Sequence, residues 1–135
     1  MEKCYHYHKE GSGLLVLGIG IDIIEIHRVE KVMQKPKFVD RIYTSGEQKY
    51  LQTRNNNPST AAGYFAAKEA TAKALGTGFG KVKWTEIEVI REKNGRPGIK
   101  LHGNAKIAME NMGGSKILVS ISHSRDNAIA QVIIC

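Results

Sequence analysis

Two carboxylates in unlike settings are the residues of this sequence best suited to chemistry. Asp22 ends the apolar run that starts at Leu14, and Glu69 lies in an alanine-rich stretch with Lys73 one helical turn later. A Gly-Thr-Gly-Phe-Gly turn, residues 76–80, follows at once. Carboxylates suit Mg²⁺, which shares its remaining positions with substrate and water, while a lysine and bare N–H groups suit phosphate. The pattern therefore indicates phosphoryl transfer, which depends on positioning and charge neutralisation.

Each of these signals also has an ordinary structural explanation. On the surface of any helix, Glu69 and Lys73 would form an ion pair worth ~0.3–0.5 kcal/mol. Strand alternation puts Gly18 and Gly20 on the face of Asp22, where the missing side chains admit either a ligand or a closely packed helix. Neither glycine pattern matches a Walker or dinucleotide-binding motif, because the required Lys-Ser/Thr and third glycine are missing.

Other polar residues leave similar alternatives open. His123 falls on the strand face of the apolar residues before it, so it either closes the edge of the core or contacts a phosphate or hydroxyl group. Arg28, Lys31 and Lys35 are spaced three and four residues apart. They form a basic stripe that is either a solvated helix face or a docking site for an acidic partner.

Composition narrows the class of protein. A chain of 135 residues favours one domain, and the net charge of +7 favours an anionic partner, which could be nucleic acid, an acidic protein or a phosphorylated ligand. The two cysteines, Cys4 and Cys135, form no disulfide framework or zinc spacing and indicate a reducing compartment. The apolar run is interrupted by Asp22 and Glu25 and is too short to cross a bilayer. We therefore expect a cytoplasmic protein.

The hydrophobic pattern predicts an order of strand, helices, hairpin, helix, hairpin. Residues 1–13 have no period and are expected to be a flexible leader outside a single domain, 14–135. The predicted strands cover residues 14–22, 84–91, 99–101, 116–123 and 128–134, and the predicted helices 25–35, 44–54, 58–75 and 104–112, with a short irregular or helical piece at 38–43. The first strand is apolar throughout, so we expect cover on both faces. This order predicts an α+β fold with helices packed on a mostly antiparallel sheet.

At this point the sequence resembles one family, the holo-acyl-carrier-protein synthases, which are small 4′-phosphopantetheinyl transferases. The matching motifs occur in family order and cover nearly the whole chain from Leu14 to Ile134. They are Gly18-Ile-Gly-Ile-Asp-Ile-Ile-Glu-Ile26 with Arg28, Arg41-Ile-Tyr-Thr44 with Glu47, Phe65-Ala-Ala-Lys-Glu-Ala70, Lys73-Ala-Leu-Gly-Thr-Gly78, Trp84 with Glu86-Ile-Glu88, Asn94-Gly-Arg-Pro97 and Ser120-Ile-Ser-His-Ser124.

The resemblance implies the 4′-phosphopantetheinyl transferase fold and a Mg²⁺-dependent reaction. The 4′-phosphopantetheine group would pass from coenzyme A to a serine of apo acyl carrier protein, releasing adenosine 3′,5′-bisphosphate, in support of fatty acid biosynthesis. Asp22, Glu69 and Lys73 would be the catalytic residues, the two carboxylates holding Mg²⁺ and the lysine a phosphate. The expected coenzyme A contacts are Lys73, Gly76, Pro97, His123 and Ser124. Arg28 would match a carrier-protein docking residue, and we expect Lys31 of the same basic stripe to dock the carrier with it.

Family members are homotrimers with sites at subunit interfaces, and the resemblance implies the same assembly here. Two positions depart from the family pattern, which often has arginine where Tyr64 stands and serine where Ala72 stands. Two other kinds of protein would explain the basic charge or the fold without this chemistry. A basic nucleic-acid-binding module is one, although no aromatic residues cluster with the basic ones. A non-catalytic trimeric scaffold is the other.

Overall fold

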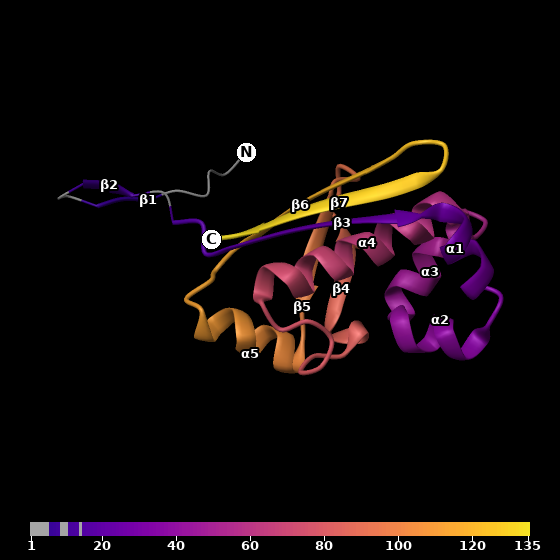
Figure 1. Cartoon of the computed structure of the whole chain (residues 1–135), viewed down its shortest axis with the longest axis horizontal. Coiled ribbons are helices and arrows are strands. Elements are labelled where there is room, and N and C mark those ends of the chain that lie inside the picture. The colour runs from indigo at the N-terminus through magenta and orange to yellow at the C-terminus, as the bar shows by residue number, and fades with distance from the viewer. Residues whose placement is uncertain (1–5, 9–10, 14) are drawn as a thin grey trace.

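The computed structural model describes residues 6–8, 11–13 and 15–135. Its central sheet has three antiparallel strands in the order β3 (Gly18–Glu25), β7 (Asn127–Ile134) and β6 (Ile117–His123). A second antiparallel pair, β4 (Ile87–Arg91) and β5 (Pro97–Leu101), lies beside β6 and crosses it in Figure 1. The helices pack against these strands, so the predicted α+β class is confirmed.

One long helix, α4 (Pro58–Leu75), packs across the face of the central sheet (Figure 1). Its first turn is capped by the side chain of Asn57, which accepts from the N–H of Ser59 at 2.8 Å. Most of its buried positions are alanine, which lets its backbone lie close to the strands. It stops at Gly76, whose φ of 73° is the left-handed conformation that glycine adopts most readily. Both ends fall where the sequence predicts them.

Three short helices gather at one end of α4, namely α1 (Ile26–Val32), α2 (Pro36–Ile42) and α3 (Ser45–Thr53) (Figure 1). The predicted capping box is present, because Thr44 accepts from the Glu47 N–H at 3.1 Å and Glu47 accepts from the Thr44 N–H at 2.8 Å. The helix predicted for residues 25–35 ends earlier, at Val32, because proline at the start of α2 leaves room only for a turn.

Two segments of the second half also differ from the prediction. Trp84 begins a single 3-10 turn, η1 (Trp84–Glu86), rather than a strand, because the Glu86 carboxylate accepts from the N–H of Lys83 at 3.0 Å and caps this turn. The last helix, α5 (Gly103–Asn111), starts one residue before the predicted position. These are shifts of boundaries, and the order of elements is as predicted.

The first strand of the domain is displaced from its predicted range, 14–22, to Gly18–Glu25. The neighbouring strand decides this, since the ladder runs from Gly18 opposite Ile134 to Glu25 opposite Asn127, the two ends of β7. Asp22 therefore lies inside the strand rather than at its end. The predicted cover on both faces is also wrong for the single chain, because Ile19, Ile21 and Ile23 are 61%, 55% and 63% exposed.

Residues 1–13 lie partly outside the described residues, and their role as a leader stays a prediction. Two strands that the sequence does not predict occur there, β1 (His6–His8) and β2 (Gly11–Gly13), paired antiparallel. No helix in the described part of the chain is long and apolar enough to cross a bilayer.

Candidate functional site

The site is built where α4 lies directly against β3. A Cβ atom added at Gly20 would come within 1.9 Å of the carbonyl oxygen of Ala70, and one at Gly18 within 2.2 Å of that of Ala74. The glycines therefore serve the close packing of a helix, one of the two alternatives open from the sequence. This packing brings the α4 residues Glu69 and Lys73 to the free edge of β3.

Lys73 bridges the helix and the strand at this edge. Its ammonium group donates to the carbonyl oxygen of Ile21 at 2.9 Å and to Oδ1 of Asp22 at 3.2 Å. The lysine side chain is 53% exposed and that of Asp22 only 15%. Lys73 thus pairs with a carboxylate of the sheet rather than forming only a surface ion pair within its own helix. The tip of the lysine side chain faces solvent, where an anion can reach it.

Glu69 completes the cluster of two acids and one base. Partial burial raises the pKa of its carboxyl group, the negative charge of Asp22 raises that pKa further, and Lys73 opposes both. Two like charges held close favour a cation between them. No group of three or more His, Cys, Asp or Glu residues in the described chain could enclose a metal ion. Two carboxylates that leave the other positions to substrate oxygens and water fit Mg²⁺, which prefers this arrangement.

Three of the N–H groups in the turn after α4, which the sequence predicts to be bare, donate within the chain instead. The Thr77 and Gly78 N–H groups donate to the carbonyl of Ala72 at 3.2 and 3.4 Å, and that of Gly76 donates to the carbonyl of Lys73 at 3.1 Å. They close the C-terminus of the helix, because its last carbonyls have no other partner. Gly76 ends α4 three residues after Lys73, and its role as a coenzyme A contact, like the phosphate cradle of the turn, stays a prediction.

The remaining predicted contacts lie across the sheet from the cluster. Pro97 is on β5 and lines a cavity of about 700 Å³ between the hairpin and β6. His123 ends β6 and is exposed, as is Ser124 after it, so this histidine does not close the core. The strand order leaves β3 and β6 at opposite edges, about 10 Å apart for two strand spacings. With α4 packed over the face between them, a single chain keeps Pro97 and His123 apart from Lys73.

The predicted docking residues are accessible on α1. Arg28 and Lys31 are exposed, and Lys31 also borders a cavity of about 560 Å³ between α1, α2, α3 and the start of α4. Lys35, the third residue of the predicted stripe, lies beyond the end of α1 at the N-cap of α2. The stripe is therefore shorter than the sequence predicts.

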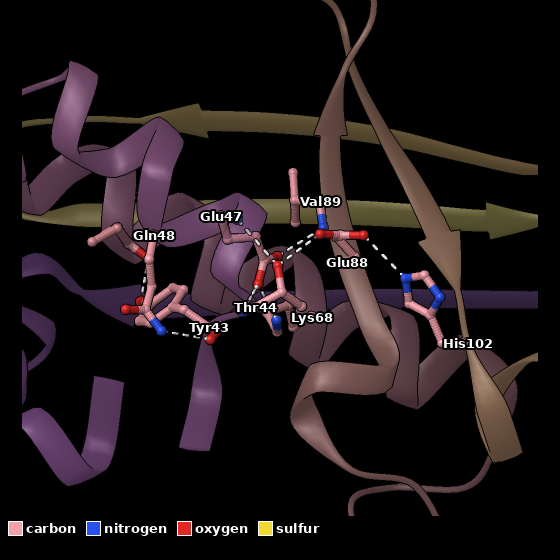
Figure 2. Close-up of polar contacts among 9 residues, drawn as sticks. Tyr43, Thr44, Glu47, Gln48, Lys68, Glu88, Val89 and His102 are labelled. Atoms are coloured by element: carbon pink, nitrogen blue, oxygen red, sulfur yellow. Dashed lines mark hydrogen bonds and ion pairs between the residues drawn. The ribbon is translucent and has the colours of Figure 1, made fainter. Parts of the chain in front are cut away.

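Sequence reasoning missed a buried polar network behind the cluster, shown in Figure 2. Lys68, the neighbour of Glu69, is fully buried and forms an ion pair with Glu47, which is 1% exposed. Glu47 also accepts from the N–H of Val89 at 2.7 Å. Burial raises the pKa of Glu47 and lowers that of Lys68, and the opposite charge of each partner counters this. One signal of this burial was available in the sequence. Lys68 lies one turn after Tyr64 and therefore on the same helix face, whereas Lys73 lies on another.

The network continues to the surface through Glu88. Its carboxylate accepts from the hydroxyl of Thr44 at 2.7 Å and contacts Nε2 of His102 at 3.0 Å. Burial alone would raise the pKa of Glu88, but the hydrogen bonds from Thr44 and His102 outweigh it and lower that pKa. The chain of contacts joins α3, β4 and the start of α5, and so it fixes the helix that carries Glu69 and Lys73 from behind.

The α+β fold places a cluster of two carboxylates and a lysine at a sheet edge, an arrangement suited to an enzyme of phosphoryl-group transfer. The model of the 4′-phosphopantetheinyl transferase superfamily matches residues 18–132, and the chain belongs to this family. The family predicted from the sequence is thereby confirmed.

Individual relatives agree over nearly their whole length. The chain is 50% identical over 120 residues to a holo-[acyl-carrier-protein] synthase of Alkaliphilus oremlandii, covering 88% of this chain and 98% of the relative. A crystal structure of the Helicobacter pylori holo-[acyl-carrier-protein] synthase with coenzyme A is similar at a TM-score of 0.77 and 35% identity, covering 87% and 99% of the two chains. The Bacillus anthracis enzyme in complex with CoA (3′,5′-ADP) is similar at a TM-score of 0.73 and 38% identity, covering 88% and 96%.

Proposed function

We propose that the protein transfers the 4′-phosphopantetheine group of coenzyme A to a serine of apo acyl carrier protein and releases adenosine 3′,5′-bisphosphate. The observation that carries this proposal is the cluster of Asp22, Glu69 and Lys73 in a member of this transferase family. The relatives named above are synthases of the holo carrier protein, and two were crystallised with coenzyme A or its adenosine bisphosphate portion.

The residues of the cluster have separate tasks in this reaction. Asp22 and Glu69 would hold Mg²⁺, which neutralises charge on the pyrophosphate of coenzyme A. Lys73, already directed to the edge of β3, donates to a phosphate oxygen as negative charge moves to the leaving group. Glu69 accepts the serine proton through a water. The serine oxygen then attacks the phosphorus on the pantetheine side, and the bond to the bridging oxygen breaks.

Intact mass spectrometry of a carrier protein tests the reaction directly. Purified protein, coenzyme A, Mg²⁺ and apo carrier should give the mass gain of one phosphopantetheine. Asp22→Asn and Glu69→Gln should stay folded and lose almost all turnover, whereas Glu110→Gln, an exposed glutamate on α5, should not. Unchanged turnover in both site variants would contradict the assigned roles. A nucleic-acid-binding module would instead give no mass gain and bind nucleic acid with a steep salt dependence.

We infer that the working form is a homotrimer with each site shared between two copies. The outer face of β3 leaves three isoleucines exposed, with Ile129 of β7 beside them, and an apolar patch of this kind is typical of an interface. The separation of Pro97 and His123 from Lys73 is a second argument. A head-to-tail ring brings one edge of a chain to the opposite edge of the next, and so joins the two halves.

Complementation between two defective variants tests the shared site. Co-expressed Asp22→Asn and His123→Ala chains should regain activity above the sum of the separate variants, because about a quarter of the sites in random trimers contain two intact halves. Activity no higher than that sum, or a monomer in sedimentation, would contradict the shared site.

Two further parts of the proposal concern the partner and the place of action. Arg28 and Lys31 would receive the acidic carrier protein by charge complementarity. We also propose a cytoplasmic location, which cell fractionation tests. Both are independent of the chemistry at the cluster.

A further inference from the structure

Arg91 has the most constrained arginine side chain in the described part of the chain. It ends β4 and lies over two stacked rings, Tyr50 of α3 and Tyr64 of α4, whose centroids are 5.6 Å apart with planes 5° from parallel. The guanidinium carbon is 5.1 Å from the Tyr50 centroid and 5.3 Å from that of Tyr64. Such contacts favour a fixed planar cation.

Two hydrogen bonds also hold the guanidinium group of Arg91 in place. Nε donates to the hydroxyl of Tyr64 at 3.0 Å, and Nη1 donates to the carbonyl of Gly95 at 3.2 Å. A guanidinium group has five N–H donors, so these bonds leave three for a ligand. No carboxylate among the described residues forms an ion pair with Arg91, and its charge is thus held in place without a matching anion.

The location of Arg91 points to a substrate. It is directly opposite Pro97 in the β4–β5 pairing, and the next residues along the hairpin, Glu92 and Arg96, line the cavity of about 700 Å³ together with Lys116. The hairpin lies beyond β6, whereas Lys73 lies at the β3 edge. Arg91 therefore belongs to the half of the site that is separate from the pyrophosphate-binding cluster.

We propose that Arg91 binds the 3′-phosphate of coenzyme A and makes the enzyme prefer it to 3′-dephospho-coenzyme A. This inference rests on the proposed function. Coenzyme A carries three phosphate groups, and two of them, the pyrophosphate, are assigned to the Lys73 cluster. The third is at the nucleotide end, where a fixed guanidinium with free donors suits a phosphate. Tyr64, which stands where the family often has arginine, holds this cation by its hydroxyl and ring instead of supplying one itself.

Steady-state kinetics with the two substrates tests the role of Arg91. Arg91→Gln should raise the KM for coenzyme A roughly ten- to a hundredfold, as expected for loss of hydrogen bonds to a charged group, with kcat little changed. Its KM for 3′-dephospho-coenzyme A should stay at the wild-type value. Arg91→Lys should recover part of the effect, because the charge remains and the planar fork is lost.

Arg54→Gln is the matched control. Arg54 also lies over the Tyr50 ring, at 5.5 Å, and donates to the Tyr50 hydroxyl at 3.3 Å, but it is the C-cap of α3 and is not part of the β4–β5 hairpin. Its removal should change neither KM. Thermal unfolding of each variant shows whether the stacked pair of Tyr50 and Tyr64 is still folded. If Arg91→Gln does not fold, Arg91→Lys is used in its place.

Calorimetric binding of both substrates separates this inference from the proposed function. Wild-type protein that binds coenzyme A more tightly than the dephospho form, with the difference lost in Arg91→Gln, supports the inference. Equal binding of the two by the wild type, or an equal loss for both in Arg91→Gln, overturns it. Absence of transfer to a carrier protein by the wild type would instead overturn the proposed function, because binding is measured without the carrier.

Discussion

Replacing Gly20 by alanine should separate α4 from β3 and disable the site. The added Cβ would lie 1.9 Å from the carbonyl oxygen of Ala70 and 2.9 Å from the amide nitrogen of Ala74. Both are backbone atoms of α4, so no side chain can rotate out of the way. Ordinary contact starts at 3.4 Å, and the helix or strand must therefore move by about 1.5 Å.

The cost of this movement can be estimated from related changes. Adding a methyl group to a well-packed interior costs ~1–3 kcal/mol, and we expect the upper part of this range because the obstacle is backbone. A loss of ~3 kcal/mol lowers the unfolding midpoint by roughly 10 °C for a chain of this size. The same movement opens the 3.2 Å contact between Lys73 and Asp22. A misplacement of ~1 Å at a reacting centre costs on the order of a hundredfold in rate, and turnover should fall at least that far.

Calorimetric unfolding and intact-mass turnover, measured on a graded set of variants, check the estimate. Gly80→Ala is the control, since a Cβ there has nothing within 4 Å. Gly63→Ala should fall between the two, because its Cβ would meet no backbone atom but only one side-chain atom, Cγ2 of Ile121, at 2.8 Å. If Gly20→Ala unfolds at the same midpoint as Gly80→Ala and keeps its turnover, the close packing of α4 on β3 does not position the cluster.

Three further changes have defined outcomes. Arg28→Glu should raise the KM for the carrier protein while leaving coenzyme A binding intact, and Lys106→Glu on α5 should change neither; equal effects of both would refute docking on α1. Lys68→Met should cost ~3–5 kcal/mol of unfolding free energy by leaving Glu47 buried and unpaired, whereas the double variant with Glu47→Gln should cost less. The pKa of Glu88 is lower in the folded chain than its ordinary 4.5, so the folded state binds fewer protons than the unfolded state. The stabilisation that the Glu88 carboxylate gives the folded chain is therefore complete above about pH 4.5 and is lost as the pH falls below it. Denaturant titrations should therefore show a weaker acid dependence for Glu88→Gln than for the wild type.

Local signals in the sequence were enough to predict much of the fold. The capping box at Thr44 and the glycine stop at Gly76 depend only on neighbouring residues, and both are present as predicted. The alternation that put Asp22 on the face of Gly18 and Gly20 also held, because it depends only on the strand period.

The features that were missed depend on partners far along the chain. The range of β3 is set by the ends of β7, more than a hundred residues away in the sequence. Lys68 carries a charge next to Glu69, and its burial is explained only by its contact with Glu47, 21 residues earlier. The separation of Pro97 from Lys73 follows from the strand order β3-β7-β6 and the contact of β5 with β6, which no single segment encodes. The bare N–H groups expected at Gly78 are used to close α4.

The central claim is that Asp22 and Glu69 share a divalent cation that binds the pyrophosphate of coenzyme A. A crystal structure of the protein with Mn²⁺ and coenzyme A, using the anomalous signal of the metal, tests it most directly. The claim predicts one peak at roughly 2 Å from an oxygen of each carboxylate and from a pyrophosphate oxygen. A peak that contacts neither carboxylate, or pyrophosphate bound away from Lys73, would contradict it.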